Sequence, residues 1–286
     1  MAEDVSKAVL ITGCSTGIGR TTAELLAGKG WTVYATARKE SAIEDLKAKG
    51  CKTLALDVTD EKSMSNAVEA VVDAEGAVGA LVNNAGYSQS GALETLPMDS
   101  VRRQFETNVF GLLRMCQLVL PGMREQGWGR IVNLSSIGGK VVFPGGGVYH
   151  ATKHAVEALS DALRFEVAGF GVKVVIIEPG LIKTEFGNTA AGSLGEAETD
   201  GPYAKFNHVV GSATQGAYEG GLSKLGGGPE TVAHKIEKAL SSRRPKTRYR
   251  VTPSAHMVLN TGALLTDRGW DRFVGTQFPH PKPEEK

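Results

Sequence analysis

The stretch VLITGCSTGIGR, from Val9 to Arg20, decides the fold of this chain. It joins a short β-rich apolar run to the start of an amphipathic helical pattern, and it places glycines at Gly13, Gly17 and Gly19. Glycine permits a tight turn and lets backbone amides approach a pyrophosphate at a helix N-terminus. A glycine turn alone is a weak signal, but between the first strand and first helix of an α/β chain it indicates a dinucleotide site.

The rest of the chain repeats the alternation of strand and helix patterns. The β-rich runs cover 8–12, 31–36, 51–56, 79–83, 130–135 and 172–178, and amphipathic segments lie between them at 17–29, 60–75, 101–120 and 149–169. Such alternation predicts an α/β fold of the Rossmann type, a doubly wound and mostly parallel sheet with helices on both faces. A further run at 247–251 is a candidate edge strand.

The domain organisation follows from where this pattern stops. We expect one dinucleotide-binding and catalytic domain over 1–251, and a C-terminal helical extension over 252–286 packed on the same domain. Residues 185–228 hold eleven glycines and little apolar periodicity, apart from a helix expected near 202–219. A segment this loose in a compact domain is usually functional, so we interpret 185–228 as a substrate lid. A surface insertion without a catalytic part is the alternative.

The composition excludes several classes of protein. The chain has 286 residues, 41% hydrophobic and 22% charged, with a net charge of +1, which is typical of a globular protein and favours neither nucleic acid nor an acidic membrane. The basic run RRPKTRYR at 243–250 could bind either, but we interpret it as a solvated helix end that leads into an edge strand. No stretch approaches the roughly 18 apolar residues of a membrane-spanning helix.

The N-terminus, the cysteines and the histidines predict a cytoplasmic protein without a metal site. The short acidic start leaves no room for a signal peptide before Ala8. Three widely spaced cysteines fit reduced thiols of a cytoplasmic protein, and six histidines in no HExxH-like cluster predict no metal site.

The end of the second predicted strand, VYATARKE, bears on the choice of nucleotide. An Asp or Glu there would bind the ribose 2′-hydroxyl of NAD, whereas a nearby arginine accommodates the 2′-phosphate of NADP. The sequence has Ala37 and Arg38 instead of an acid, and Ser15 could add a hydrogen bond to the phosphate. We therefore expect NADP(H) to be preferred over NAD(H), although a solvated surface charge is the default interpretation of any lone arginine.

Six more motifs follow the glycine loop in order. They are LDVTD at 56–60, NNAG at 83–86, ETNVFG at 106–111, GRIVNLSSIGG at 129–139, YHATK at 149–153 and PGLIKT at 179–184. Together they resemble the short-chain dehydrogenase/reductase family, in its single-domain branch, over residues 7 to about 184. The loop ITGCSTGIG, VYATAR and GALE at 91–94 are most similar to hydroxysteroid and retinol dehydrogenase relatives.

The resemblance implies roles for individual residues. The catalytic tetrad would be Asn108, Ser136, Tyr149 and Lys153. The cofactor would contact Gly13, Ser15, Thr16, Gly17, Ile18, Gly19, Arg38, Asp57, Val58, Asn84, Ala85, Gly86, Tyr149, Lys153, Pro179, Gly180, Ile182 and Thr184. Thr16 stands where many NADP-using relatives carry a second basic residue, so Arg38 would act without that help. Ser135 is also a serine, but Ser136 has the family's spacing to the tyrosine.

The pair Tyr149 and Lys153 has a physical reason for its spacing. A tyrosine phenol has an unperturbed pKa of about 10, so it is a weak proton donor at neutral pH. A lysine four residues on lies one helical turn away on the same face. An ammonium about 5 Å away, at an effective dielectric of about 20, stabilises a phenolate by roughly 3 kcal/mol. The spacing therefore suits a tyrosine that exchanges a proton with substrate.

The sequence thus predicts an NADP(H)-dependent carbonyl reductase or alcohol dehydrogenase. Val142, Phe143 and Phe186, next to the catalytic motifs, would line an apolar pocket for a small-molecule ketone or alcohol. The resemblance also implies a homodimer or homotetramer, with 101–120 and the helix of Tyr149 at the subunit interface. Two alternatives remain: a non-catalytic NADP(H)-sensing binding protein, and a sugar-nucleotide epimerase or dehydratase, whose glycine spacing differs.

Overall fold

A computed structural model describes residues 5–196, 201–219, 224–278 and 280–281. The described chain contains one seven-stranded sheet in the order β3-β2-β1-β4-β5-β6-β7, and every pairing in it is parallel. The strands are β1 (Val9–Ile11), β2 (Val33–Ala37), β3 (Lys52–Ala55), β4 (Ala80–Asn83), β5 (Gly129–Leu134), β6 (Val172–Pro179) and β7 (Arg248–Val251). The predicted fold class is confirmed, and the predicted edge strand is β7.

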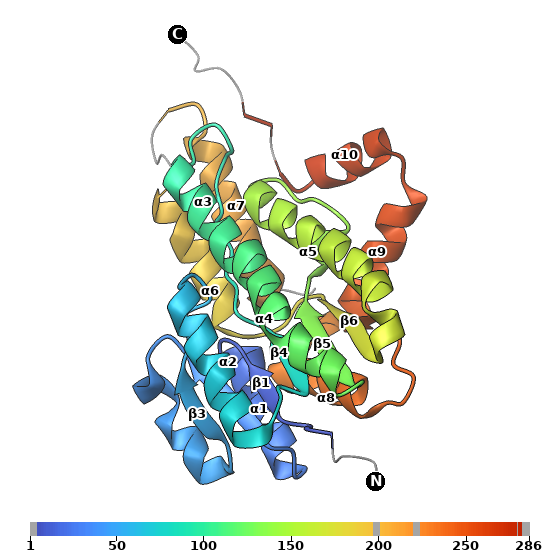
Figure 1. The fold of residues 1–286 in the computed structure, drawn as a ribbon. Helices are drawn as coiled ribbons and strands as arrows, with labels where there is room; N and C mark the ends of the chain where they lie inside the picture. The colour runs from blue at the N-terminus through green and yellow to red at the C-terminus, as the bar shows by residue number, and fades with distance from the viewer. Residues whose placement is uncertain (1–4, 197–200, 220–223, 279, 282–286) are drawn as a thin grey trace.

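Helices cover both faces of the sheet (Figure 1). One face carries α1 (Gly17–Gly28), the 3-10 helix η1 (Glu40–Lys49) and α8 (Pro229–Ser241), and the other carries α2 (Glu61–Glu75), α4 (Gly111–Glu125) and α5 (Gly147–Glu166). This is the doubly wound, single-domain arrangement expected from the alternating pattern.

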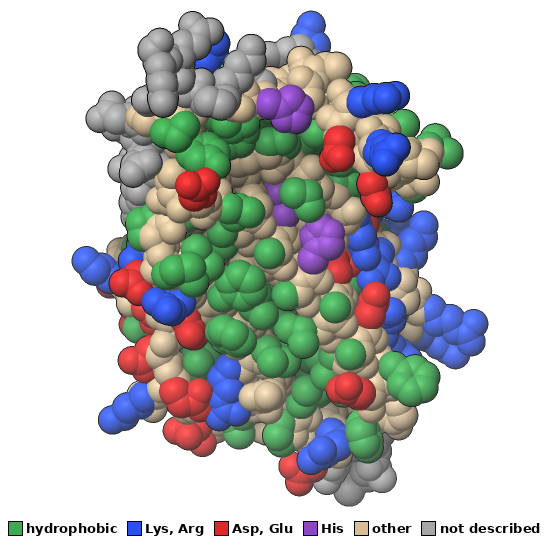
Figure 2. All heavy atoms as spheres, turned by 90° about the horizontal axis from the view of Figure 1, so that it is seen from above, with side chains coloured by type: hydrophobic (Ala, Val, Ile, Leu, Met, Phe, Trp, Pro, Cys, Tyr) green, Lys and Arg blue, Asp and Glu red, His purple; other side chains and the backbone are tan. Residues whose placement is uncertain are grey.

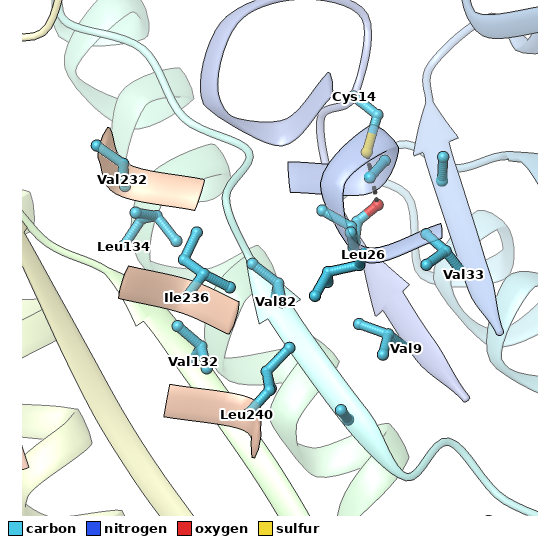
Figure 3. Close-up of a cluster of buried hydrophobic side chains, with 14 of the residues drawn as sticks. Val9, Cys14, Leu26, Val33, Val82, Val132, Leu134, Val232, Ile236 and Leu240 are labelled. Atoms are coloured by element: carbon cyan, nitrogen blue, oxygen red, sulfur yellow. Dashed lines mark hydrogen bonds between the residues drawn. The ribbon is translucent and has the colours of Figure 1, made fainter. Parts of the chain in front are cut away.

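The apolar cluster on the first face shows what holds these layers together (Figure 3). Val9, Val82 and Val132 lie on adjacent strands, and each is fully buried. Leu26 of α1 and Ile236 of α8 pack against the same cluster. Burial of one such side chain is worth about 1.5–3 kcal/mol, so a truncation here weakens the platform that carries the site.

The predicted helix over 101–120 is interrupted. The structure has α3 (Met98–Phe105), then a π-helical turn η2 (Glu106–Phe110), then α4. Sequence periodicity cannot detect a single π turn, because its one extra residue only shifts the phase of the apolar positions. The turn contains Asn108, which is buried.

The later part of the chain is more helical than its pattern suggested. Residues 185–228 contain α6 (Glu185–Gly192), the 3-10 turn η5 (Ser193–Glu196) and α7 (Ala204–Glu219), close to the helix expected near 202–219. Residues 197–200 and 220–223 of the predicted lid lie outside the described residues. The C-terminal part contains α9 (Pro253–Leu264) and α10 (Asp267–Gly275), and two short 3-10 turns complete the elements, η3 (Ile137–Gly139) and η4 (Ala168–Phe170).

The basic run at 243–250 is only partly solvated. Arg248 of β7 forms ion pairs with Glu157 at 3.0 Å and with Asp161 at 2.5 Å, both on α5. These contacts tie the edge strand to the helix of Tyr149. No helix in the described part of the chain is long and apolar enough to cross a membrane.

The three cysteines are free and buried. Burial raises the pKa of Cys14 to about 12, of Cys51 to about 11 and of Cys116 to about 12. Thiols with such pKa values are not nucleophilic at neutral pH. They belong to the packing of the core, including Cys14 within the glycine loop.

Candidate active site

The candidate site lies where the strand order reverses, between β1 and β4. In open parallel sheets, ligands bind in the crevice outside the carboxyl ends of the strands at this point. Asn84, directly after β4, donates its side-chain amide to the carbonyls of Thr12 and Gly13, each at 2.9 Å. The hydroxyl of Thr12 in turn accepts from the backbone amides of Asn84 and Ala85 at 3.0 Å. The glycine loop and the NNAG motif therefore form one hydrogen-bonded unit.

The loop requires glycine at its three positions for two different physical reasons. Gly13 and Gly17 have φ angles of 75° and 58°, in the left-handed region that other residues rarely adopt. Gly19 instead lies against the loop, where an added Cβ would be 2.4 Å from the carbonyl oxygen of Gly13. Gly19 thus permits close packing of helix on loop, and it does not itself border the cavity.

The N-terminus of α1 fits the pyrophosphate of a dinucleotide. Thr16, the N-cap residue, makes no side-chain capping bond, and the first turn of the helix has no acid. The first backbone amides of α1 consequently have no capping partner from Thr16, and the helix dipole favours an anion there. This end of α1 borders a cavity of about 1040 Å³ that runs on past the tyrosine motif.

The cavity brings together most of the predicted site. It is lined by Gly13, Ser15, Thr16, Gly17, Ile18, Arg38, Asp57, Val58, Asn84, Ala85, Gly86, Ser136, Phe143, Tyr149, Lys153, Pro179, Gly180, Ile182, Thr184 and Phe186. Three predicted residues are not among its lining residues: Gly19, Asn108 and Val142. Val142 is 48% exposed, and its carbonyl accepts a hydrogen bond from the indole of Trp270. The structure thus gives no support to Val142 as a pocket wall.

The residues expected to select the nucleotide lie at one end of this cavity. Arg38 follows β2 directly, is exposed and lines the cavity with Ala37 and Ser15. Among the described residues, no carboxylate lies within ion-pair distance of the Arg38 guanidinium. Asp57 holds Thr59 through two hydrogen bonds to one carboxylate oxygen, at 2.9 Å and 2.8 Å. This end can therefore offer a cation to a phosphate and a carboxylate to an adenine ring.

Lys153 is buried and its ammonium lies near the tyrosine. Its Nζ donates to the carbonyl of Leu134 at 2.7 Å and lies 5.7 Å from the centre of the Tyr149 ring. Burial lowers the pKa of Lys153 to about 8, while the carboxylate of Glu157 acts in the opposite direction. The side chain is consequently mostly charged at neutral pH and close to its titration range.

The side chain of Asn108, which lies in the π turn, forms three hydrogen bonds to residues outside that turn. Its amide donates to the carbonyl of Tyr87 at 2.9 Å and to the hydroxyl of Thr152 at 3.1 Å, and its oxygen accepts from the backbone amide of Tyr87 at 3.1 Å. An added Cβ on Gly86 would lie 3.0 Å from Asn108 Oδ1 and 3.8 Å from Lys153 Nζ. Asn108 thus connects the NNAG region to the helix of Tyr149, and it contacts Gly86 behind the cavity wall.

The two adjacent serines are placed differently. Ser136 is the N-cap of η3, and its Oγ accepts from the backbone amide of Gly138 at 3.1 Å. The Oγ of Ser135 is buried, without a hydrogen-bond partner among the described residues, and an added Cβ on Gly139 would be 2.6 Å from it. Both residues border the cavity, but Ser135 is buried with its hydroxyl, whereas Ser136 is only partly buried.

The sequence analysis missed several residues that build the site. Thr12 and Tyr87 hold its polar framework, and His150, next to the tyrosine, borders the cavity with a pKa lowered to about 4 by burial and then by His154. The cavity is also lined by Val210, Ala213 and Thr214 of α7 and by Met257, Val258, Phe273, Gln277 and Phe278 of the C-terminal part. Thr12 could have been found from its place in the glycine motif, whereas the late residues carry no local signal.

Comparisons with known proteins identify the family of this chain. The family model described as short chain dehydrogenase matches residues 7–193. An uncharacterized oxidoreductase, YbbO of Escherichia coli, is 34% identical over 271 residues and 94% of each chain. An NADPH-dependent 3-dehydrocapnine reductase of Ornithobacterium rhinotracheale is 34% identical over 92% of this chain and 94% of the relative. A 3-ketodihydrosphingosine reductase of Bacteroides thetaiotaomicron is 43% identical over 62% of this chain and 65% of the relative.

Two solved structures extend the agreement to three dimensions. A short-chain dehydrogenase from Streptomyces avermitilis is 37% identical, with a TM-score of 0.80 over 95% of this chain and 97% of that one. The protein ElxO, solved with NADP bound, is 26% identical, with a TM-score of 0.70 over 86% of this chain and 97% of that one. From the seven-stranded parallel sheet, the glycine loop and these matches, the chain belongs to the short-chain dehydrogenase/reductase family of oxidoreductases.

Proposed function

We propose that the protein is an NADP(H)-dependent oxidoreductase that interconverts an apolar ketone and its secondary alcohol. One observation carries the proposal: Tyr149, Ser136 and Lys153 line the same cavity as the glycine loop and the N-terminus of α1. A site for an anionic cofactor and a proton donor beside a buried cation therefore share one cavity. This is the arrangement that hydride transfer to a carbonyl needs.

In the reductive direction Tyr149 is the general acid. Its phenol donates a proton to the carbonyl oxygen as that oxygen gains negative charge. Lys153 stabilises the phenolate that remains, because its ammonium is buried and 5.7 Å from the ring centre. Ser136 donates a hydrogen bond to the same carbonyl oxygen and orients it. NADPH, held by the glycine loop and Arg38, would supply the hydride.

Asn108 contributes to this chemistry through position. Its side chain is committed to Tyr87 and Thr152, so we infer that it fixes the π turn against the helix that carries Tyr149 and Lys153. The hydroxyl of Thr152 also donates to the carbonyl of Tyr149 at 2.7 Å, which links Asn108 to the residue that transfers the proton. The family resemblance implies that Asn108 also holds a water that relays protons to Lys153.

NADP(H) is the expected cofactor because of the end of β2. Arg38 borders the cavity without a carboxylate partner among the described residues, and Ala37 offers no acid to the ribose 2′-hydroxyl. A charge-assisted bond from a guanidinium to a phosphate is worth roughly 1.5–3 kcal/mol. The NADPH-dependent relative and the NADP-bound neighbour support the same choice.

The substrate class follows from the wall and from the relatives. Phe143, Phe186 and the residues of the C-terminal helices give the far side of the cavity an apolar lining. Two relatives are named as reductases of 3-ketodihydrosphingosine and of 3-dehydrocapnine. We therefore propose a ketone that carries a long alkyl chain, with the carbonyl at Tyr149 and the chain along the apolar wall.

Residues 185–228 are proposed to act as a lid over the substrate. Phe186 of α6 lies 5.5 Å, ring centre to ring centre, from Tyr149. The segment is attached to the loop after β4 by polar contacts: Gln89 and Ser90 donate to Ser193 at 2.9 Å, and the backbone amide of Ala92 donates to Asn207 at 3.0 Å. These residues are largely buried, but the contacts are few, so their release would open the segment without unfolding the sheet.

A homodimer or homotetramer is proposed for the assembly. Hydrophobic side chains gather over the middle of one face of the molecule, with charged side chains toward its margins (Figure 2). Two phenylalanines of the helices expected at the interface are unusually exposed, Phe110 at 53% and Phe165 at 87%. Exposed apolar surface of this kind marks interaction sites. The molar mass measured by light scattering tests the proposal, and a monomer at micromolar concentration would contradict it.

The proposed activity is tested by the loss of NADPH absorbance with a panel of ketones. The panel spans steroids, retinoids, acyl thioesters, aryl ketones and long-chain 3-ketones, each with NADPH and with NADH. Turnover of one apolar class with NADPH supports the proposal. Tight binding of NADPH without turnover of any member would instead favour the non-catalytic NADP(H)-sensing protein.

A further inference from the structure

The C-terminal helices are fixed to the catalytic region at two separate points. At the start of α9, Ser254 Oγ accepts from the backbone amide of Leu181 at 3.1 Å, beside the PGLIKT motif. The residue before the helix, Thr252, has a φ of 87°, which a β-branched residue adopts only when its surroundings impose it. An added Cβ on Gly180 would lie 2.6 Å from Thr252 Oγ1, so this junction is packed closely against the cavity wall.

The second point of attachment is the loop between Ser136 and Tyr149. The indole of Trp270 on α10 donates to the carbonyl of Val142 at 2.9 Å, and its ring lies 5.6 Å from that of Phe143 in an edge-on arrangement. One residue earlier in the loop, Val141 Cγ1 would lie 2.5 Å from a Cβ on Gly262 of α9. Three consecutive loop residues are thus held by the C-terminal helices.

An aromatic path connects α10 to the reacting centre. Phe273 lies 5.4 Å from Trp270, Trp270 lies 5.6 Å from Phe143, and Phe143 lies 6.0 Å from His150, all between ring centres. The ring of His150 is 5.6 Å from that of Tyr149. Of these rings, Trp270 is the one that does not border the cavity, so it supports the wall from behind.

We propose that Trp270 is a specificity-determining residue, which holds Phe143 and α10 together as the wall that receives the alkyl chain of the substrate. Phe143 on the loop and Phe273 on α10 both line the cavity, and Trp270 contacts both. If the indole is removed, the two phenylalanines lose their common support and a long chain loses a fixed surface. The proposed function places the carbonyl group at Tyr149 and the cofactor at the glycine loop, so neither is expected to contact Trp270, which does not line the cavity. This inference rests on the proposed function.

The test compares butan-2-one, octan-2-one and dodecan-2-one with NADPH in three variants. Trp270→Ala removes the ring system and the hydrogen bond. Trp270→Phe keeps one aromatic ring but removes the hydrogen bond and part of the packing surface. Leu264→Ala is the matched control. Leu264 is on the same pair of helices, 86% exposed, and it is not among the lining residues of the cavity.

Trp270→Ala should lower kcat/KM for dodecan-2-one by about tenfold or more, through KM, and for butan-2-one by less than about twofold. Trp270→Phe should have an intermediate effect, and Leu264→Ala none. The NADPH dissociation constant should stay the same in all three variants. An equal loss for short and long ketones, or no loss for the long one, would overturn the proposal, provided that thermal melting shows folded protein.

A binding measurement separates this inference from the proposed function. Calorimetry with dodecan-2-ol and NADP+ needs no turnover, and it should show weaker binding to Trp270→Ala than to the wild type. If no ketone is reduced but dodecan-2-ol still binds more tightly to the wild type than to Trp270→Ala, the proposed activity is refuted and the proposed role of Trp270 is supported. Equal affinity of dodecan-2-ol for the wild type and for Trp270→Ala would refute the proposed role of Trp270.

Discussion

Replacement of Lys153 by methionine measures how much stability the buried ammonium removes from the fold. Lys153 is 6% exposed, and burial lowers its pKa from 10.5 to about 8, opposed by Glu157. Between these two pH values the unfolded chain binds more protons than the folded chain, so the free energy of unfolding rises with pH. The charge therefore destabilises the fold below about pH 8, and this effect disappears as the pH rises toward 10.5.

The size of the effect follows from the two pKa values. The difference between 10.5 and about 8, at about 1.36 kcal/mol per unit, corresponds to roughly 3 kcal/mol at neutral pH. About 2 kcal/mol of this should be recovered between about pH 7 and about pH 9.5. Methionine carries no charge, and it leaves the carbonyl of Leu134 without its donor, a loss of about 1–3 kcal/mol that does not depend on pH.

The assay is urea denaturation of wild type and Lys153→Met at several pH values without cofactor. The free energy of unfolding of the wild type should gain about 2 kcal/mol relative to the variant from about pH 7 to about pH 9.5. Lys173→Met, which removes an exposed lysine of β6, is the control and should show no such trend. A difference between wild type and Lys153→Met that stays constant with pH would refute the reasoning.

Three more predictions test the rest of the site. Tyr149→Phe should keep NADPH binding and lose about 10²–10⁴-fold in turnover, because only the transferable proton is removed; near-normal turnover would exclude Tyr149 as the acid. Arg38→Ala, and more so Ala37→Asp, should weaken NADPH relative to NADH by roughly tenfold or more in binding titrations; a wild type that already prefers NADH would contradict this. Limited proteolysis within 185–228 should slow when NADPH and a substrate analogue are both bound, and it should be faster in Asn207→Ala; equal rates in both states would favour a surface insertion.

The parts of the molecule built from local patterns could be predicted from the sequence. The six runs and the late edge strand correspond to β1–β7, because a buried parallel strand needs an uninterrupted apolar run. The glycine loop could be placed because Gly13 and Gly17 adopt backbone angles that only glycine tolerates well. The same reasoning placed Tyr149 and Lys153 on one helix face, since a spacing of four residues means one turn.

Features that depend on distant contacts could not be predicted. The π turn at Asn108 is stabilised by Tyr87 and Thr152, which lie 21 and 44 residues away in the chain. The basic run at 243–250 suggested solvated charge, yet Arg248 forms ion pairs with two carboxylates of α5, 87 and 91 residues earlier, and with Glu178 of β6. No local pattern tells which carboxylate an arginine will meet across the fold.

The two halves of the cavity therefore differ in how they are encoded. The half proposed to bind the cofactor is made by turns that directly follow β1, β2 and β4, where a short motif determines both the backbone and the contacts. The half proposed to bind the substrate is made by α6, α7, α9 and α10, which are held at the site by long-range contacts such as that of Trp270 with Val142. Changes in these four helices can alter the apolar wall without disturbing the motifs, because none of the helices contributes a strand to the sheet. A full-length relative at 34% identity can hence share the cofactor half and differ in substrate, so chain-length selectivity must be measured on this protein.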